Sequence, residues 1–355
     1  MRALFVLSLL ALVLGACASP STAPERNLRG SVLPANADAA TIDIAKAAGD
    51  DTIVLAIGEH DVTAAALAGA AAVRAAGLRL GYWLEVGRCE RLADAHPEWI
   101  ASLQGHDEWR LDVPGFAEPP ADQIVVAWPW TPVLYAEAFA AHEQRIAAQL
   151  RALPPADFVF LNNLQGPPGA CGCGNVLCRW AVDYTLHGRA PARKATLLAP
   201  DAAARFVAAV QALAPKSSVI PVWVTECEQA DTAPTGACHG VGCYGGLCWR
   251  EFDRQWLPLE DKCEQIALAL PWRAFKRDQT RHGEPAGWVA FAIEHLRARA
   301  ASHHGGELSA ARLVAVVDDD GTGVGPAMAR AAGVTAILVL RVALDVSTVP
   351  RLRAR

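Results

Sequence analysis

Short β-branched runs alternate with alanine-rich amphipathic segments from Asp51 onward, and this alternation limits the possible folds more than any other feature. The runs are almost continuously apolar, which is typical of parallel strands that are covered on both faces. Eight strands separated by helices predict a (β/α)8 barrel of the TIM type, with an open doubly wound sheet as the alternative. The expected strands are Thr52–Ile57, Leu78–Leu84, Ile124–Trp128, Phe158–Leu161, Val219–Val224, Ile266–Leu270, Leu313–Val317 and Ala336–Leu340.

The segments between these strands have helical periodicity and suitable ends. Pro132 and Pro326 fit a first helical turn, and Gly77 and Gly333 fit the position after a helix. No internal repeat or second core is visible, so a single barrel domain is expected. The expected helices are Val62–Ala76, Glu90–Leu103, Pro132–Leu153, Asp201–Leu213, Trp249–Glu264, Trp288–Ala300 and Pro326–Ala332.

The first residues have the pattern of an export signal. Arg2 precedes the apolar stretch Ala3–Leu14, which is too short to span a bilayer as a stable helix. Leu14-Gly15-Ala16-Cys17 resembles the lipobox of bacterial lipoproteins, which implies cleavage before Cys17 and lipidation of its thiol; an ordinary secretory signal is the alternative. The resemblance implies an extracytoplasmic protein that contacts the membrane through its lipid. Ala18 then favours the outer membrane in a cell that has one.

These features define three segments of the chain. We expect a signal peptide over 1–16, a lipidated N-terminus and flexible tether over 17–40, and the barrel domain over 41–355. The tether is inferred from a segment rich in Ser, Pro, Ala and Asn.

The overall charge limits the class of partner. The chain of 355 residues has a formal net charge of −5, so it has no surplus of cations to neutralise nucleic-acid phosphates. A hydrophobic content of 52% supports a large core. We therefore expect no nucleic acid as a partner. The residues at the strand ends, described next, indicate a carbohydrate or another polar small molecule as ligand.

Polar and aromatic side chains follow many of the expected strands, where a barrel carries its catalytic groups. Carboxylates end four of these strands, and tryptophans lie close by. Sugars stack on tryptophan faces and form hydrogen bonds with carboxylates and amides. The candidate substrate-binding residues are Trp83, Trp128, Trp130, Asn162, Asn163, Trp223 and Arg341.

The segments Gly81–Arg88 and Ala95–Trp99 resemble, loosely, those of exported barrel glycoside hydrolases. The resemblance implies two carboxyl groups that flank a glycosidic bond, about 5 Å apart for retention or ~6.5–9.5 Å apart for inversion. Glu226 and Asp318 are the leading pair, with Glu226 as proton donor and Asp318 as nucleophile or base. Glu85 is the third candidate.

The fourth expected strand departs from that pattern. Many barrel glycosidases carry Asn-Glu at this position, whereas this chain has Asn162-Asn163. The sequence therefore leaves open whether the protein is an enzyme. The alternatives are a non-catalytic glycan-binding or structural envelope lipoprotein and a metal-dependent hydrolase.

Long glycine- and cysteine-rich loops are expected after the fourth and fifth strands. In an oxidising compartment such loops are typically held by disulfides, and a tetrahedral Zn²⁺ site bound by thiolates is the alternative. No other cofactor is expected. The cysteines assigned to disulfides or a metal are Cys171, Cys173, Cys178, Cys227, Cys238, Cys243 and Cys248.

Overall fold

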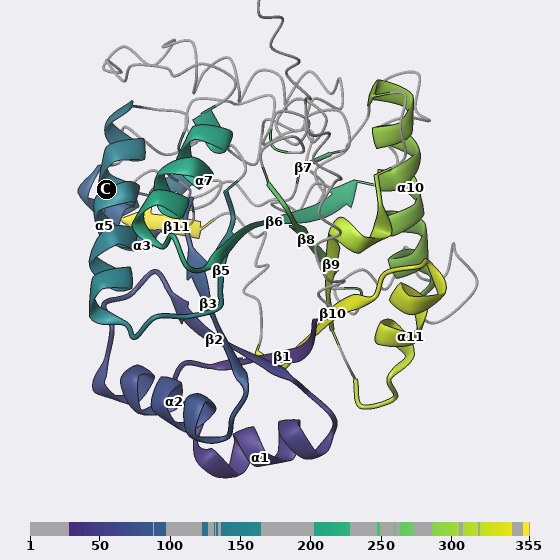
Figure 1. Cartoon of the computed structure of the whole chain (residues 1–355). Coiled ribbons are helices and arrows are strands. Elements are labelled where there is room, and N and C mark those ends of the chain that lie inside the picture. The colour runs from purple at the N-terminus through teal and green to yellow at the C-terminus, as the bar shows by residue number, and fades with distance from the viewer. Residues whose placement is uncertain are drawn as a thin grey trace, which may run out of the picture.

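The computed structural model contains a closed barrel of parallel strands with helices outside it (Figure 1). It describes residues 28–87, 89–96, 123–126, 131, 133, 136–164, 202–227, 247–248, 259, 263–270, 272, 286–304, 308–318, 320–342 and 351–354. The barrel strands follow the order β5-β3-β2-β1-β10-β9-β8-β6, and β6 pairs with β5 to close the ring. The predicted (β/α)8 fold is confirmed.

The barrel strands are short and all of their pairings are parallel. They are β1 (Arg29–Pro34), β2 (Thr52–Gly58), β3 (Arg79–Glu85), β5 (Phe158–Asn162), β6 (Ser218–Cys227), β8 (Ile266–Leu270), β9 (Leu313–Asp318) and β10 (Ala336–Leu340). The helices are α1 (Ala39–Ala47), α2 (Ala64–Ala75), α3 (Glu90–Ala95), α5 (Ala136–Ala152), α7 (Ala202–Leu213), α10 (Gly287–His304), η3 (Ala310–Arg312) and α11 (Val324–Ala331).

The first barrel strand, β1, lies in the segment that the sequence assigned to a tether. Arg29–Pro34 pairs with β10 on one side and β2 on the other. Asp38 then caps α1, because its carboxylate accepts a hydrogen bond from the Thr41 amide at 2.8 Å. The predicted boundary at residue 41 is therefore wrong, and the barrel includes residues from β1 onward.

The expected third strand is not part of the barrel. Its residues appear as β4 (Gln123–Val126), which pairs antiparallel with β11 (Arg351–Ala354) in a separate sheet. The other seven expected strands are barrel strands. Because β1 replaces β4 in the count, β5 is still the fourth strand of the ring.

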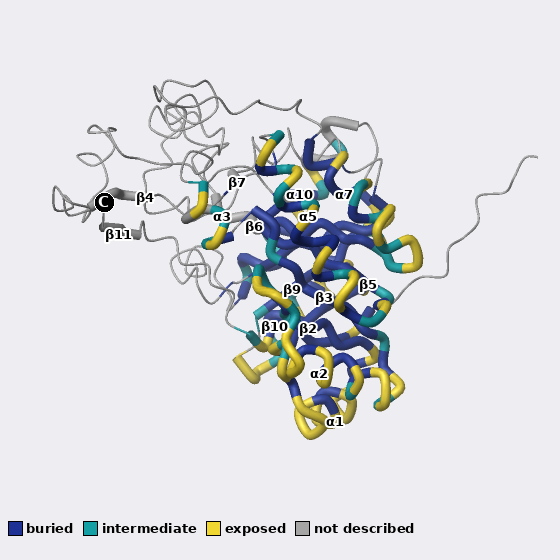
Figure 2. The backbone as a smooth tube through the Cα atoms, turned by 90° about the vertical axis from the view of Figure 1, so that its left-hand side faces the viewer, coloured by how far each residue is buried: buried dark blue, intermediate teal, exposed yellow. Residues whose placement is uncertain are grey.

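Two buried layers result from strand alternation. Residues from all eight barrel strands form one cluster, which occupies the interior of the ring; it includes Val32, Val54, Trp83, Phe160, Val222, Ala269, Val316 and Leu338. The alternate residues of the same strands pack with the helices in a second, larger cluster. Figure 2 shows the buried strands surrounded by helices such as α1 and α2, whose outer residues are exposed.

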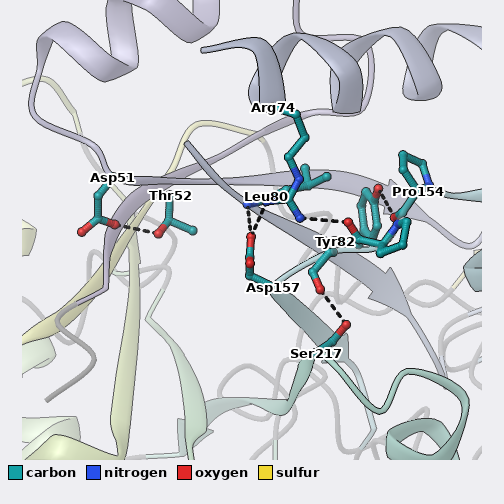
Figure 3. Close-up of polar contacts among 10 residues, drawn as sticks. Asp51, Thr52, Arg74, Leu80, Tyr82, Pro154, Asp157 and Ser217 are labelled. Carbon is teal, nitrogen blue, oxygen red and sulfur yellow. Dashed lines mark hydrogen bonds and ion pairs between the residues drawn. The ribbon is translucent and has the colours of Figure 1, made fainter. Parts of the chain in front are cut away.

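Polar contacts join the amino ends of the strands (Figure 3). Asp157 precedes β5, and its carboxylate accepts hydrogen bonds from the Leu80 amide and from Arg74, each at 2.8 Å. The Tyr82 hydroxyl donates to the carbonyl of Pro154 at 2.8 Å. These contacts connect β3 with the start of β5 at the end of the barrel opposite to the carboxyl ends of the strands.

Candidate active site at the carboxyl ends of the strands

Glu85 is the last residue of β3, at the carboxyl end of the third barrel strand. Gly81, Trp83 and Glu85 alternate along β3, and Trp83 belongs to the interior cluster, so Glu85 lies on the interior face. In the register of the two strands Glu85 is opposite Asn162, the last residue of β5. The sheet thus brings together two residues that are distant in the sequence.

Two amides and an indole donate hydrogen bonds to the Glu85 carboxylate. Asn162 Nδ2 lies 2.5 Å from Oε1, and Asn163 Nδ2 lies 2.5 Å from Oε2. Trp83 Nε1 lies 3.3 Å from Oε1. Since each of these groups is a donor, the arrangement suits an ionised carboxylate, which accepts hydrogen bonds and donates none.

The backbone around Asn162 and Asn163 holds both amides in place. Val86 N donates to the carbonyl of Asn162 at 2.9 Å, and Gly87 N donates to that of Asn163 at 3.0 Å. Asn163 has a φ of 54°, a left-handed conformation that asparagine adopts more readily than most residues. Both asparagines are buried. Both amides therefore contact Glu85, and the role of the two asparagines in substrate binding stays a prediction.

Trp83 is a buried support for Glu85. Its ring stacks on Phe160 with centroids 6.0 Å apart and planes 20° apart, and its side chain is 1% exposed. An indole this buried has no open face for a sugar ring. Its predicted role as a stacking platform is therefore wrong for this structure, and its N–H orients the carboxylate instead.

Asp318 ends β9, which lies opposite β3 in the ring: three strands separate them in either direction. Val314 and Val316 belong to the interior cluster, and alternation places Asp318 on the same face. The Trp272 indole donates to the Asp318 carbonyl at 2.8 Å and fixes the end of the strand. Two carboxylate-bearing strands, β3 and β9, therefore face each other across the barrel mouth.

Two predicted substrate-binding residues face the helices. Trp223 is fully buried in the layer between strands and helices. Arg341 donates from Nε to Ser31 Oγ at 3.1 Å, and Ser31 shares the helix-facing side of β1 with Leu33. The prediction that Trp223 and Arg341 line the mouth is wrong, because strand alternation directs them outward.

Other predicted site residues lie outside the described residues: Cys17, Trp128, Trp130, Cys171, Cys173, Cys178, Cys238 and Cys243. For Glu226, Cys227 and Cys248 only the backbone is described. Glu226 is the penultimate residue of β6, and Cys227 is opposite Cys248 of β7 (Leu247–Cys248) in the strand register. Among the described residues no group of three or more His, Cys, Asp or Glu side chains could hold a metal ion. The disulfide and zinc assignments stay predictions.

A buried polar group on α5 was missed by sequence reasoning. His142, Arg145 and Gln149 are buried, and each contacts backbone or side-chain atoms near the carboxyl ends of β2 and β3. Their spacing of three and four residues places them on one face of α5 together with Ala138. The sequence pattern that indicates such a group is a set of polar residues on the core-facing side of an amphipathic helix.

His142 is a neutral imidazole in this group. Its Nε2 donates to the carbonyl of Thr131 at 2.6 Å, and Nδ1 lies 3.3 Å from Arg145 Nη2, so Nδ1 is assigned as the acceptor. Burial, assisted by the nearby charge of Arg145, lowers the pKa of His142 to about 3. The imidazole therefore stays unprotonated across the physiological range.

This lowered pKa predicts an acid-dependent loss of stability. His142 binds a proton near pH 6.5 in the unfolded chain and only near pH 3 in the folded chain. The contribution of neutral His142 to the free energy of unfolding is therefore complete above pH 6.5, and it decreases as the pH falls from 6.5 toward 3. Between pH 7 and pH 4.5 the wild type should lose about 2–3 kcal/mol more than His142→Gln. Urea unfolding at both pH values measures this difference. The exposed-residue variant His60→Gln is the control, and equal slopes for all three proteins would contradict the prediction.

Comparisons with known proteins give a likeness of fold only. No protein-family model matches the chain, and no curated protein matches it. Among solved structures it is similar to the PgaB (BpsB) glycoside hydrolase domain from Bordetella bronchiseptica, with a TM-score of 0.47 and 10% identity over 88% of this chain and 93% of that one. It is also similar to α-L-fucosidase isoenzyme 2 from Paenibacillus thiaminolyticus, with a TM-score of 0.44 and 15% identity over 88% of this chain and 46% of that one.

Proposed function

We propose that this protein is a glycan-processing barrel related in mechanism to glycoside hydrolases. The observation that carries the proposal is the Glu85 carboxylate, which is held by Asn162, Asn163 and Trp83 at the barrel mouth, across from the strand that ends in Asp318. Barrel enzymes carry their catalytic groups at this end of the strands.

The hydrogen bonds of Glu85 suggest its role. A carboxylate surrounded by donors is suited to attack the anomeric carbon, to stabilise the positive charge that develops there, or to deprotonate water. The second carboxyl group then donates a proton to the leaving oxygen as the glycosidic bond breaks. We assign this proton donor to Asp318, with Glu226 as the other candidate. This assignment replaces the roles that the sequence alone suggested.

We also propose that the protein acts in the cell envelope. The apolar stretch Ala3–Leu14 and the lipobox-like Leu14-Gly15-Ala16-Cys17 support export and attachment through a lipid on Cys17, with the outer membrane favoured by Ala18. In the part of the chain that the structure describes, no helix has the length and apolarity needed to cross a membrane. Because the proposed attachment is through the lipid on Cys17, Cys17→Ala should release the protein from the membrane fraction.

A non-catalytic glycan-binding protein is the second candidate. Two observations favour it: the fourth strand ends in Asn162-Asn163 without an acid, and the Glu85 oxygens already accept amide hydrogen bonds. A carboxylate fixed in this way could also serve as an acceptor for sugar hydroxyls.

Incubation with purified glycans distinguishes these candidates. The panel contains neutral, amino-sugar and deoxy-sugar polysaccharides, and the readouts are new reducing ends and heat of binding. Cleavage that survives treatment with a metal chelator supports the proposal. Binding without cleavage supports the second candidate, and chelator-sensitive cleavage supports the metal-dependent hydrolase. Absence of both binding and cleavage for every glycan in the panel would overturn the proposed glycan-related function.

A further inference from the structure

A buried guanidinium lies directly behind the residue that carries the proposed chemistry. Arg145 of α5 is 6% exposed. Its Nη2 donates to the backbone carbonyl of Glu85 at 2.5 Å and to that of Val86 at 3.2 Å. Its Nη1 reaches the carbonyl of Glu59, at the end of the neighbouring strand, at 3.5 Å. Arg145 thus contacts the ends of β2 and β3 from the helix layer.

Gln149 and His142 orient this guanidinium from the same face of α5. Gln149 Oε1 accepts from Arg145 Nη1 at 3.4 Å, while its Nε2 donates to the carbonyls of Gly58 at 3.2 Å and His60 at 2.7 Å. His142 Nδ1 lies on the other side of the guanidinium. Arg145 and Gln149 together bind consecutive carbonyls at the carboxyl ends of two adjacent strands, and His142 contacts the guanidinium.

The charges around Arg145 give the arrangement a second consequence. Burial lowers the pKa of Arg145, while nearby Cys89, Glu59 and Glu85 counteract this effect. Burial also raises the pKa of the Cys89 thiol to about 11, so that thiol is neutral at physiological pH. Glu59 and Glu85 are therefore the nearby carboxyl groups whose charge counteracts the effect of burial on Arg145. Arg145 therefore carries its charge close to Glu85 as well as binding its backbone.

We propose that Arg145 is a positioning residue for Glu85, a role that rests on the proposed function. It holds the backbone from which the carboxylate projects, so that the side chain meets the amides of Asn162 and Asn163. Because it lies behind the strand, it acts on the substrate only through Glu85.

Kinetics of paired variants test this role on the glycan that the wild type cleaves. Arg145→Met keeps the volume of the side chain but removes its charge and donors, and we expect kcat to fall about 100-fold, the size of effect seen for small misplacements of a catalytic group. KM should change less than about threefold, because the substrate contacts remain. Arg145→Lys restores the charge and should recover part of kcat. Arg151→Met, an exposed arginine on the same helix, is the matched control.

A double-mutant cycle separates positioning from general support of the fold. In a Glu85→Gln background, Arg145→Met should lower the residual rate less than threefold, because the residue through which it acts has already been changed. An equal loss in both backgrounds would mean that Arg145 only stabilises the barrel. Circular dichroism checks that each variant is folded.

A measurement without substrate covers the case in which no glycan is cleaved. The amides of Val86 and Gly87 donate to the carbonyls of Asn162 and Asn163, and their hydrogen exchange reports on this connection. We expect Arg145→Met to accelerate exchange at both amides at least tenfold, relative to the amides of β10. Unchanged exchange would overturn the positioning role, whereas faster exchange without cleavage would leave the positioning role intact and reject the hydrolase.

Discussion

Replacement of Glu85 with glutamine is expected to reduce glycan cleavage by about 10²–10⁴-fold, the range typical of a removed acid–base group. The substitution keeps the shape of the side chain but removes the charge that attack or charge stabilisation requires. It also places an amide nitrogen toward the Asn162 or Asn163 amide, where two donors face each other. This mismatch should lower stability by about 1–3 kcal/mol.

The measurement combines initial rates with a thermal denaturation curve for each protein. Glu137→Gln, at an exposed position in the first turn of α5, is the control with the same chemical change and should retain wild-type activity. Asp318→Asn should slow glycan cleavage, because it removes the proposed proton donor. The loss of rate should be smallest for substrates with a good leaving group, which need protonation least. A Glu85→Gln protein that remains folded and cleaves glycans at the wild-type rate would remove Glu85 from the mechanism.

A chain that begins at residue 41 is expected not to fold, whereas a chain that begins at Leu28 is expected to fold. The shorter chain lacks β1, and β2 and β10 would become open edges of the ring. It also loses Leu28, Val32 and Leu33, all buried in the core. Full burial of each contributes roughly 1.5–3 kcal/mol, so their sum is comparable with the roughly 5–15 kcal/mol by which a typical domain is stable.

Chemical denaturation followed by circular dichroism measures this difference. The chain from Leu28 should show a cooperative transition, and the chain from residue 41 should show none. A point variant tests the same strand without truncation. A Cβ atom at Gly30 would lie 2.0 Å from the Thr52 carbonyl oxygen, so Gly30→Val should disrupt the pairing of β1 with β2. Cooperative unfolding of the chain from residue 41 would show that β1 is dispensable.

Most of the barrel could be predicted because its strands have a strong local pattern. The stretches around Val159, Leu268 and Val316 are continuously apolar, since each strand is covered by the interior cluster on one face and by helices on the other. β1 has no such pattern: Gly30, Ser31 and Pro34 interrupt it. It is a strand because β2 and β10 supply partners on both sides, which no local signal reveals.

The position of the candidate site was easier to predict than the contacts between its side chains. Glu85, Asp318 and Asn162 were identified because each ends a strand, and the ends of parallel strands meet at one side of a barrel. The contact of Asn162 and Asn163 with Glu85 depends on the register between β3 and β5. The residues in contact are more than seventy positions apart in the sequence, so no local pattern reveals this register. The contribution of Arg145 depends on how α5 packs against β2 and β3.

Local patterns in the sequence were enough to predict the alternation of strands and helices and the carboxylates and amides at strand ends, because hydrophobic burial and turn chemistry act over short stretches of chain. The place of β1 in the ring and of β4 outside it followed from the three-dimensional arrangement, since strand pairing depends on distant partners. Closure of the barrel also decided which side chains face inward: Glu85 faces the mouth, while Trp223 and Arg341 face the helices.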